Sequence, residues 1–388
     1  MEISACVKYV GVNDHQVDLF EGQYKVPNGM SYNSYVILDE KIAVMDTVDG
    51  FFTEEWLNNV EQVLGGKMPD YLVIQHMEPD HSASIPAFLK KYPKATVVST
   101  AKGFQFMEQF FPEFFAGQEL PTEQRIVAAN DGVLELGQHS LHFVYAPMVH
   151  WPEVMMTYEA TEKILFAADG FGKFGALDVE EEWADEARRY YIGIVGKYGP
   201  QVQAVLKKAA GLDIWTICSL HGPVLKENLG FYLEKYDKWS SYQPEESGVV
   251  IAYASVYGNT RNAAEYLADV LQEKGQKTVL YDLARCDKAK AVADAFRYDR
   301  LVLAGITYNG DLFPCMRSFI EGLTERNYQN RKVAIIENGT WAPMAGKLIL
   351  GMFEKSKNLT FTETTVSVKS AMNEQNKGEI GKLAEELC

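Results

Sequence analysis

Residue types that bind metals gather in one short stretch of the chain. His76, Glu78, Asp80 and His81 fall within six positions, directly after the apolar run 71–74. A short apolar run bounded by turn residues predicts a buried strand, so we expect these side chains in the loop at its end. Alternate residues of an extended segment share a face, so His76, Glu78 and Asp80 can converge while His81 addresses a second ion. Imidazoles combined with carboxylates favour iron, manganese or zinc over copper(I).

Three further ligand types follow predicted strands in the first half of the chain. Each comes at or just past the C-terminal end of an apolar or alternating run: His150 after 140–145, Asp169 after 163–168 and His221 after 214–220. Strand ends in α/β layers commonly assemble an active site along one edge. We therefore expect these residues to join the first cluster at one site.

The remaining histidines and the cysteines have no comparable setting. His15, His139 and His142 are interpreted as exposed or ordinary polar positions. The five cysteines are scattered, and none forms a Cys-x-x-Cys pair. This pattern is typical of buried thiols in a reducing cytoplasm and excludes a built-in rubredoxin or iron–sulfur module of the usual spacing. We therefore expect a cytoplasmic protein.

Length and charge narrow the class of protein. A chain of 388 residues favours two domains. The net charge of −16 argues against nucleic acid and against an anionic membrane surface as partners. We identify no signal peptide and no apolar run long enough to span a bilayer.

A glycine-rich segment from Gly170 to Gly175 matches the pattern G-x-G-x-x-G after a strand. A dinucleotide site would need a helix opening within the motif and a second strand that ends in an acidic residue. The acidic segment 178–183 follows instead. The motif is therefore interpreted as a flexible loop beside Asp169.

The second half of the chain has a more regular pattern. The polar stretch 236–247 predicts a domain boundary, which gives domains 1–247 and 248–388. The run 249–254 predicts a buried strand and 261–274 a helix. The loop between them, 255–260, offers hydroxyls and backbone N–H groups to a phosphomonoester such as that of FMN. A plain β–α turn is the alternative.

Two more polar loops with aromatic residues follow the predicted strands 300–306 and 332–336. A doubly wound sheet of order 2-1-3-4-5 binds its ligand where such loops meet. Tyr308 and Trp341 are candidates to cover the isoalloxazine ring of a flavin. The candidate flavin-binding residues of the three loops are Ser255, Val256, Tyr257, Gly258, Asn259, Thr260, Thr307, Tyr308, Asn309, Gly310, Asp311, Asn338, Gly339, Thr340 and Trp341.

The metal motif resembles that of the metallo-β-lactamase-like fold. Hydrolases of that fold usually have His at the third motif position, where this chain has Glu78. Glu78 at this position, together with the segment His150-Trp-Pro-Glu153, makes the motif resemble that of the flavodiiron proteins. In that family the cluster is a non-haem di-iron site. The resemblance implies His76, Glu78 and His150 on one iron and Asp80 and His221 on the other. Asp169 would bridge the two irons, and the role of His81 stays open.

The second half resembles flavodoxin, so the whole chain resembles a flavodiiron protein of the minimal two-domain class. Segment 255–260 is close to the phosphate loop of that family, whereas Ile306 and segment 338–343 depart from its commoner forms. The expected fold class is α/β. It consists of an N-terminal metallo-β-lactamase-like αββα domain followed by a flavodoxin-like doubly wound parallel sheet.

The resemblance implies an oxidoreductase in which FMN relays electrons from a soluble carrier to a di-iron site. That site would reduce O2 to water, NO to N2O, or both, and the sequence does not rank them. The donor would be a rubredoxin-like protein or a reduced deazaflavin, and the assembly a head-to-tail homodimer or a dimer of dimers. Tyr24 and Trp151 are candidates to line the oxidant pocket, although ordinary packing explains each equally well.

Two other classes of function remain as alternatives. One is a zinc hydrolase with a flavodoxin-like appendage, against which Glu78 and the intact phosphate loop argue. The other is an electron carrier or binding protein whose metal site is only structural. Structural zinc sites are typically closed and rich in thiolates, whereas the ligand set proposed for this chain contains no cysteine.

Overall fold

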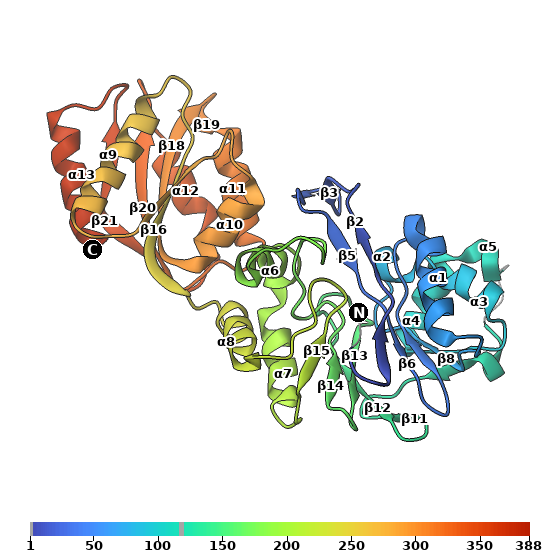
Figure 1. Cartoon of the computed structure of the whole chain (residues 1–388). Coiled ribbons are helices and arrows are strands. Elements are labelled where there is room, and N and C mark those ends of the chain that lie inside the picture. Colours follow the sequence, from blue (N-terminus) through green and yellow to red (C-terminus); the bar gives the residue numbers. More distant parts are fainter. Residues whose placement is uncertain (1–2, 116–119) are drawn as a thin grey trace. The chain divides into compact units, whose positions relative to one another are not determined.

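The computed structural model describes residues 3–115 and 120–388. The chain folds into two compact units, one made of Met1–Tyr191 and Pro200–Tyr236 and the other of Ile192–Gly199 and Asp237–Cys388. Figure 1 labels those of their elements for which there is room. In the described parts of the chain, no helix combines the length and the apolar composition that crossing a membrane requires.

The first unit contains two main sheets. The six-stranded sheet has the order β1 (Val7–Tyr9), β6 (Tyr35–Ile37), β7 (Ala43–Met45), β8 (Tyr71–Val73), β9 (Thr96–Ser99) and β10 (Arg125–Val127). The five-stranded sheet has the order β11 (Val133–Glu135), β12 (Ser140–Tyr145), β13 (Met155–Glu159), β14 (Ile164–Phe166) and β15 (Thr216–Cys218). Two short pairs complete the strands: β2 (Val12–Asp14) with β5 (Met30–Tyr32), and β3 (Leu19–Phe20) with β4 (Tyr24–Lys25).

Helices cover the outer sides of this sandwich. Figure 1 shows α1 and α4 outside the six-stranded sheet and α7 outside the five-stranded sheet. The helices of this part of the chain are α1 (Thr53–Leu64), α2 (Pro79–Ser82), α3 (Ile85–Lys91), α4 (Ala101–Phe110), α5 (Pro112–Phe115), α6 (Trp183–Tyr190), α7 (Gly199–Ala209) and α8 (Leu229–Ser240).

The core of the first unit lies between the two sheets. One buried apolar cluster includes Val7, Met45 and Val73 from one sheet and Phe143 and Phe166 from the other. Side chains alternate between the two faces of a strand, so each sheet turns one apolar face to this core. The expected αββα layering is confirmed.

The second unit is a parallel sheet with helices on both faces. Its strand order is β17 (Thr278–Asp282), β16 (Glu246–Tyr253), β18 (Tyr298–Tyr308), β20 (Arg331–Asn338) and β21 (Leu359–Val368), with β19 (Asp311–Leu312) antiparallel to β18. This is the expected order 2-1-3-4-5. Figure 1 shows α9 (Asn259–Glu273) and α13 (Glu374–Glu386) on one face and α10 (Lys288–Arg297), α11 (Pro314–Thr324) and α12 (Ala345–Met352) on the other.

Two segments differ from their expected character. The polar stretch 236–247 is mostly regular, because α8 continues to Ser240 and β16 begins at Glu246. The glycine-rich segment, expected to be a flexible loop beside Asp169, is packed inside the unit, since residues 170–176 are all buried. Its backbone is tied down by bonds from the N–H of Phe171 to the hydroxyl of Tyr236, at 2.6 Å, and from the N–H of Gly175 to the carbonyl of Gly29, at 3.1 Å.

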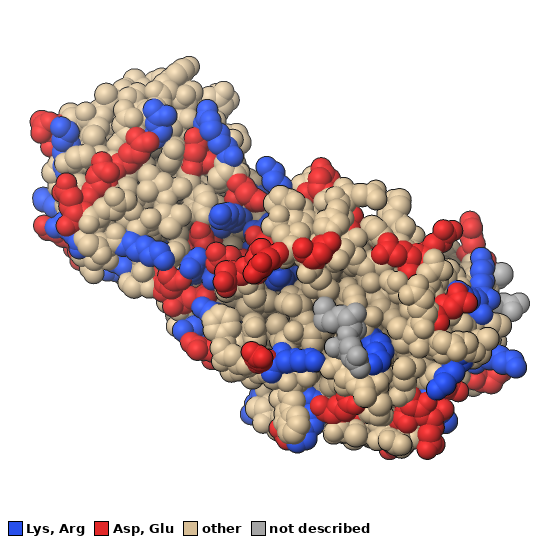
Figure 2. All heavy atoms as spheres, in the orientation of Figure 1, with Lys and Arg blue, Asp and Glu red and all other residues tan. Residues whose placement is uncertain are grey.

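Charged side chains of both signs are interspersed on the face of the molecule that Figure 2 shows. A nucleic-acid partner would need a continuous basic field. The visible face offers no such field, which agrees with the net charge of −16.

Candidate functional site

The structure brings the seven predicted metal ligands together in two neighbouring groups. The first group consists of His76, Glu78, His150 and Asp169, whose donor atoms all lie within 4.8 Å of one another. Nε2 of His150 lies 3.0 Å from Oε2 of Glu78 and 3.0 Å from Oδ2 of Asp169. Nε2 of His76 lies 3.2 Å and 3.3 Å from the same two oxygens. Two imidazoles and two carboxylates therefore face one small volume.

The second group consists of Asp80, His81 and His221. Oδ2 of Asp80 lies 3.2 Å from Nε2 of each histidine, and the two Nε2 atoms are 3.0 Å apart. The expectation that Asp80 shares a face with His76 and Glu78 is wrong. The extended conformation ends at Glu78, and the helix α2 that follows carries Asp80 and His81 away to the second group.

Asp169 lies between the two groups. Its Oδ2 faces the first group, whereas its Oδ1 lies 3.5 Å from Nε2 of His81 and 3.9 Å from Nε2 of His221. The strand β14 ends at Phe166. Ala168, whose φ of 48° lies in the left-handed region, then turns the backbone just before Asp169. One buried carboxylate thus presents a different oxygen to each group.

The donor set fits a pair of cations. All four carboxylate oxygens of Asp80 and Asp169 are buried, and none has a partner of regular hydrogen-bond geometry among the described residues; the groups closest to them are the imidazoles of the same two clusters. A buried carboxylate without partners is unfavourable unless a cation or a donor compensates it. A cation at each group would satisfy these oxygens, and nitrogen and oxygen donors without thiolate suit iron, manganese or zinc.

Neighbouring groups orient two of the imidazoles. Nδ1 of His76 bonds to Oε1 of Glu153 at 2.8 Å, and Nδ1 of His221 bonds to the carbonyl of Ser31 at 2.7 Å. Because these Nδ1 atoms donate, the Nε2 lone pairs are left to face the site. The sequence reasoning did not single out Glu153 or Ser31. Glu153 lies in the motif that begins at His150, whereas a backbone carbonyl such as that of Ser31 leaves no signal in the sequence.

The histidines and carboxylates of the site shift one another's pKa values. Burial lowers the pKa of His150, but hydrogen bonds to Asp169 and Glu78 outweigh it and raise that pKa to about 9. Burial favours the neutral form of Asp80, yet the charge of His81 and the bond from His221 hold its pKa well below its usual range. The raised pKa values of His150 and His81 mean that protons on these two imidazoles provide positive charge that cations would otherwise provide.

Aromatic rings surround both groups. Trp151 packs edge-on against the ring of His76, with centroids 5.3 Å apart, so it lies beside the first group. Tyr24 packs on Phe174 at 5.5 Å, and Phe174 contacts Tyr190, whose ring is 5.4 Å from that of His221. The ring contacts therefore place Tyr24 behind the rings that contact the second group.

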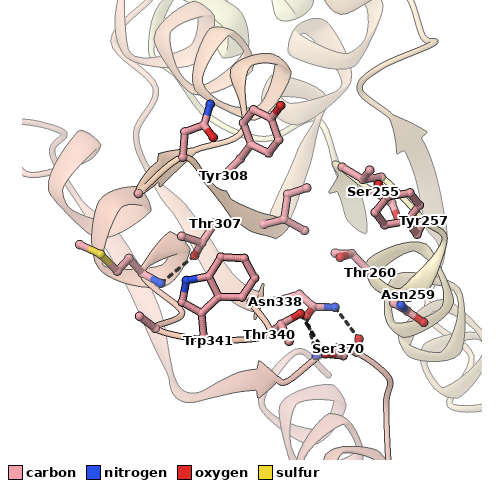
Figure 3. A pocket seen from close by; sticks show the side chains of 17 residues that line it. Ser255, Tyr257, Asn259, Thr260, Thr307, Tyr308, Asn338, Thr340, Trp341 and Ser370 are labelled. Atoms are coloured by element: carbon pink, nitrogen blue, oxygen red, sulfur yellow. Dashed lines mark hydrogen bonds between the residues drawn. The ribbon is translucent and has the colours of Figure 1, made fainter.

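The second unit holds a cavity of about 420 Å³ where the loops after β16, β18 and β20 meet. Figure 3 shows Ser255, Tyr257 and Thr260 on one side of it and Tyr308 and Trp341 on the other. Thirteen of the fifteen predicted flavin-binding residues line the cavity: Ser255, Val256, Tyr257, Asn259, Thr260, Thr307, Tyr308, Asn309, Gly310, Asn338, Gly339, Thr340 and Trp341.

Gly258 and Asp311 do not line this cavity. Gly258 stabilises the turn of the loop: its φ is 92°, and its N–H donates to Oγ of Ser255 at 3.1 Å. The side chain of Asp311 binds Arg317 and accepts from the N–H of Leu312. The lining also includes residues that were not predicted: Ile306, Ala342, Met344 and Ser370.

The cavity fits a phosphorylated flavin. Gly258, the N-cap of α9, provides no side-chain cap, so the N–H groups of the first turn remain available to an anion. Tyr308 and Trp341, the two aromatic residues expected to cover the ring, are 48% and 82% exposed. Large aromatic side chains that project into solvent at a cavity rim are suited to stack on a flat ring.

Comparison with known proteins agrees with this geometry. Residues 30–222 match the model of the ODP family beta lactamase, and residues 250–360 match that of a flavodoxin domain. An anaerobic nitric oxide reductase flavorubredoxin of Vibrio vulnificus is 28% identical over 86% of this chain and 69% of its own length.

Solved structures show the same fold over the whole chain. The rubredoxin oxygen:oxidoreductase of Desulfovibrio gigas superposes with a TM-score of 0.91 at 24% identity, covering 100% of this chain and 97% of its own. The flavodiiron protein of Giardia intestinalis superposes with a TM-score of 0.87 at 25% identity, covering 100% and 96%.

The relatives and the two sites together support FMN and a non-haem di-iron centre as the cofactors. The resemblance that the motifs predict is therefore confirmed, and this chain has the architecture of a flavodiiron protein, with a metallo-β-lactamase-like domain followed by a flavodoxin-like domain.

Proposed function

We propose that this chain is a flavodiiron oxidoreductase that takes electrons from a soluble carrier and reduces O2 to water, NO to N2O, or both. The observation that carries the proposal is the position of Asp169, whose two oxygens face two separate groups of buried ligands. When bound, FMN supplies electron transfer in single steps, and a pair of irons supplies binding and polarisation of a small oxidant.

The residues of the first unit would hold the metals and exclude water. In this proposal His76, Glu78 and His150 would hold one ion, Asp80, His81 and His221 would hold the other, and Asp169 would supply an oxygen to each. His81 is included because its Nε2 faces Asp80 as closely as that of His221 does. Burial of all four histidines beside Asp169 keeps bulk water from the carboxylates.

The residues of the second unit bind the flavin. The loop 255–260 and the first turn of α9 would hold the phosphate, while Tyr308 and Trp341 would cover the ring. All proposed metal ligands precede residue 248 and all proposed flavin contacts follow it. We therefore assign 1–247 to the metal domain and 248–388 to the flavin domain.

The donor and the assembly belong to the same proposal. The relatives named flavorubredoxin and rubredoxin oxygen:oxidoreductase support a rubredoxin-like donor, with a reduced deazaflavin as the second candidate. We further propose a head-to-tail homodimer, alone or paired with a second dimer, in which the flavin domain of one chain serves the metal domain of its partner.

A mixed dimer tests this arrangement. One chain carries Asp169→Asn, which impairs the metal centre, and the other carries Thr260→Asp, which places a negative charge in the phosphate loop. Each variant alone should be inactive, while the mixed dimer should regain activity because one intact flavin domain meets one intact metal domain. Activity that does not return on mixing would overturn the head-to-tail arrangement.

The function itself is tested by measuring O2 and NO consumption with a chemically reduced rubredoxin. Consumption of either gas that depends on the donor, on iron and on FMN supports the proposal. Hydrolysis of an amide or ester substrate by zinc-loaded protein, with no gas consumption, would support the hydrolase alternative instead. That alternative finds no support in the relatives described above.

A further inference from the structure

A second cluster of metal-ligand types lies in the first unit, away from the centre described above. The donor atoms of Cys6, His139 and Glu162 all lie within 4.8 Å of one another. Cys6 directly precedes β1, His139 lies in the turn between β11 and β12, and Glu162 lies in the turn between β13 and β14. His139, expected to be an exposed or ordinary polar residue, is not exposed: it is buried, with 3% of its surface accessible.

The strand directions place this cluster at the other end of the sandwich. The metal centre follows the C-terminal ends of β8, β12 and β14, whereas His139 and Glu162 precede β12 and β14. Asp39, which contacts His139, precedes β7, a strand parallel to β8. The two clusters are therefore separated by the length of the strands.

Hydrogen bonds fix the imidazole of His139 in the orientation of a metal ligand. Its Nδ1 bonds to Oδ2 of Asp39 at 2.8 Å, and the same oxygen accepts the backbone N–H of His139 at 2.7 Å. Its Nε2 is turned toward Glu162, 3.5 Å from Oε1. A carboxylate that accepts from one ring nitrogen while the other faces a ligand site is the usual support of a metal-bound histidine.

The carboxylate of Glu162 lacks a full set of partners. Its Oε2 is buried and has no hydrogen-bond partner among the described residues. The turn that carries it is held by Glu159, which accepts the N–H of Thr161 at 2.8 Å and that of Glu162 at 2.7 Å. The side chain of Glu162 is thus aimed at the cluster and is not required to form the turn.

The charge around Cys6 is suited to a cation. Burial raises the pKa of the Cys6 thiol, and the negative charges of Glu162 and Asp39 raise it further. The thiol is partly accessible, and its backbone is fixed because its carbonyl accepts from the N–H of Leu38 at 2.9 Å. A divalent cation would replace the thiol proton and offset the surplus of negative charge.

We propose that Cys6, His139 and Glu162 form a site for zinc or a similar borderline divalent cation, with Asp39 as the residue that positions His139. Sulfur, imidazole nitrogen and carboxylate oxygen are the donors that zinc takes in proteins. The ion would tie the N-terminal segment before β1 to two turns of the five-stranded sheet. This site is independent of the proposed reductase activity.

Cobalt(II) is a selective probe, because the metal centre contains no cysteine. Cobalt(II) added to the full-length holoprotein should produce a thiolate-to-cobalt charge-transfer band in the difference spectrum. The band should be absent in Cys6→Ser and His139→Gln and retained in Cys388→Ser, a matched control at an exposed cysteine. Asp39→Asn should keep the band at saturation but need about 10–100-fold more cobalt to reach it. The neighbouring exposed Glu40→Gln should not shift the midpoint.

Alkylation provides a test that does not depend on a variant folding. Zinc should slow maleimide modification of Cys6 at least about tenfold, as read by mass spectrometry of its peptide, and leave Cys388 unaffected. Protection of Cys6 together with the cobalt band supports the site. An unchanged Cys6 rate, or a cobalt band that survives in Cys6→Ser, overturns it and leaves the cluster as a hydrogen-bonded imidazole between two carboxylates.

Discussion

Glu153 holds His76 in one orientation: its Oε1 is 2.8 Å from Nδ1 of the imidazole and accepts the backbone N–H of Met77 at 2.9 Å. Removal of this acceptor in Glu153→Ala should free the ring and lower iron affinity or reductase activity about 10–100-fold. Iron titration of the metal-free protein measures the affinity. The exposed Glu123→Ala is the control, and an equal loss in both variants would count against a specific role for Glu153.

Asp169→Asn removes the charge that both ligand groups share. The loss should exceed the roughly 10–100-fold effect expected for a supporting residue, because both ions lose a ligand. Iron content and gas consumption should both fall, while FMN content stays at the wild-type level because its pocket lies in the other unit. Retention of full iron by this variant would exclude Asp169 as a bridge.

Metal uptake should depend on pH through His150. Its pKa in the metal-free protein is about 9, above the ordinary value of 6.5, so the imidazole is protonated at neutral pH. A metal must displace this proton, and the apparent affinity should therefore rise at least about tenfold per pH unit until pH approaches 9. Isothermal titration in buffers of different ionisation enthalpy counts the released protons. Release of none at pH 7 would contradict the geometry.

The raised pKa of His150 should also make the unfolding free energy of the metal-free protein depend on pH. The pKa of His150 is higher in the folded state than in the unfolded state, so its protonation stabilises the metal-free fold. This stabilisation is complete below pH 6.5 and is lost as the pH rises toward 9. Urea unfolding of metal-free wild type and His150→Gln should show this: the difference between them should shrink between these pH values. A difference that grows with pH would contradict the sign.

The hydroxyl of Thr260 should contribute to FMN binding. Thr260→Val keeps the shape of this buried residue but loses a donor to the phosphate, which weakens binding by about 1.5–3 kcal/mol. Quenching of FMN fluorescence on titration with flavin-free protein measures the change. The control is Thr324→Val, at the end of α11, which should bind FMN as tightly as the wild type does.

The sequence predicts most of the fold because local patterns are strong in this chain. The strand order of the second unit follows from the regular alternation of apolar runs, polar loops and helical spacing. The seven metal donors follow from residue types at strand ends. These features depend on periodicity and residue identity, which a sequence records directly.

The sequence-based predictions missed, or described wrongly, the features that depend on three-dimensional contacts. The grouping of Asp80 with His81 depends on a helical turn that starts at Pro79, which alternation does not reveal. The roles of Ser31 and Asp39 depend on contacts between distant segments, such as the 100 residues that separate Asp39 from His139. The burial of segment 170–176 depends on neighbours such as Tyr236, which no local pattern indicates.

Each chain is proposed to hold one bridged pair of irons and one FMN. The most direct measurement is the iron, zinc and FMN content of anaerobically purified protein, in a Cys6→Ser background so that the second cluster does not contribute zinc. We predict about two irons and one FMN per chain, with iron lost and FMN retained in Asp169→Asn. Zinc in place of iron with little flavin, or iron unaffected by Asp169→Asn, would contradict the account.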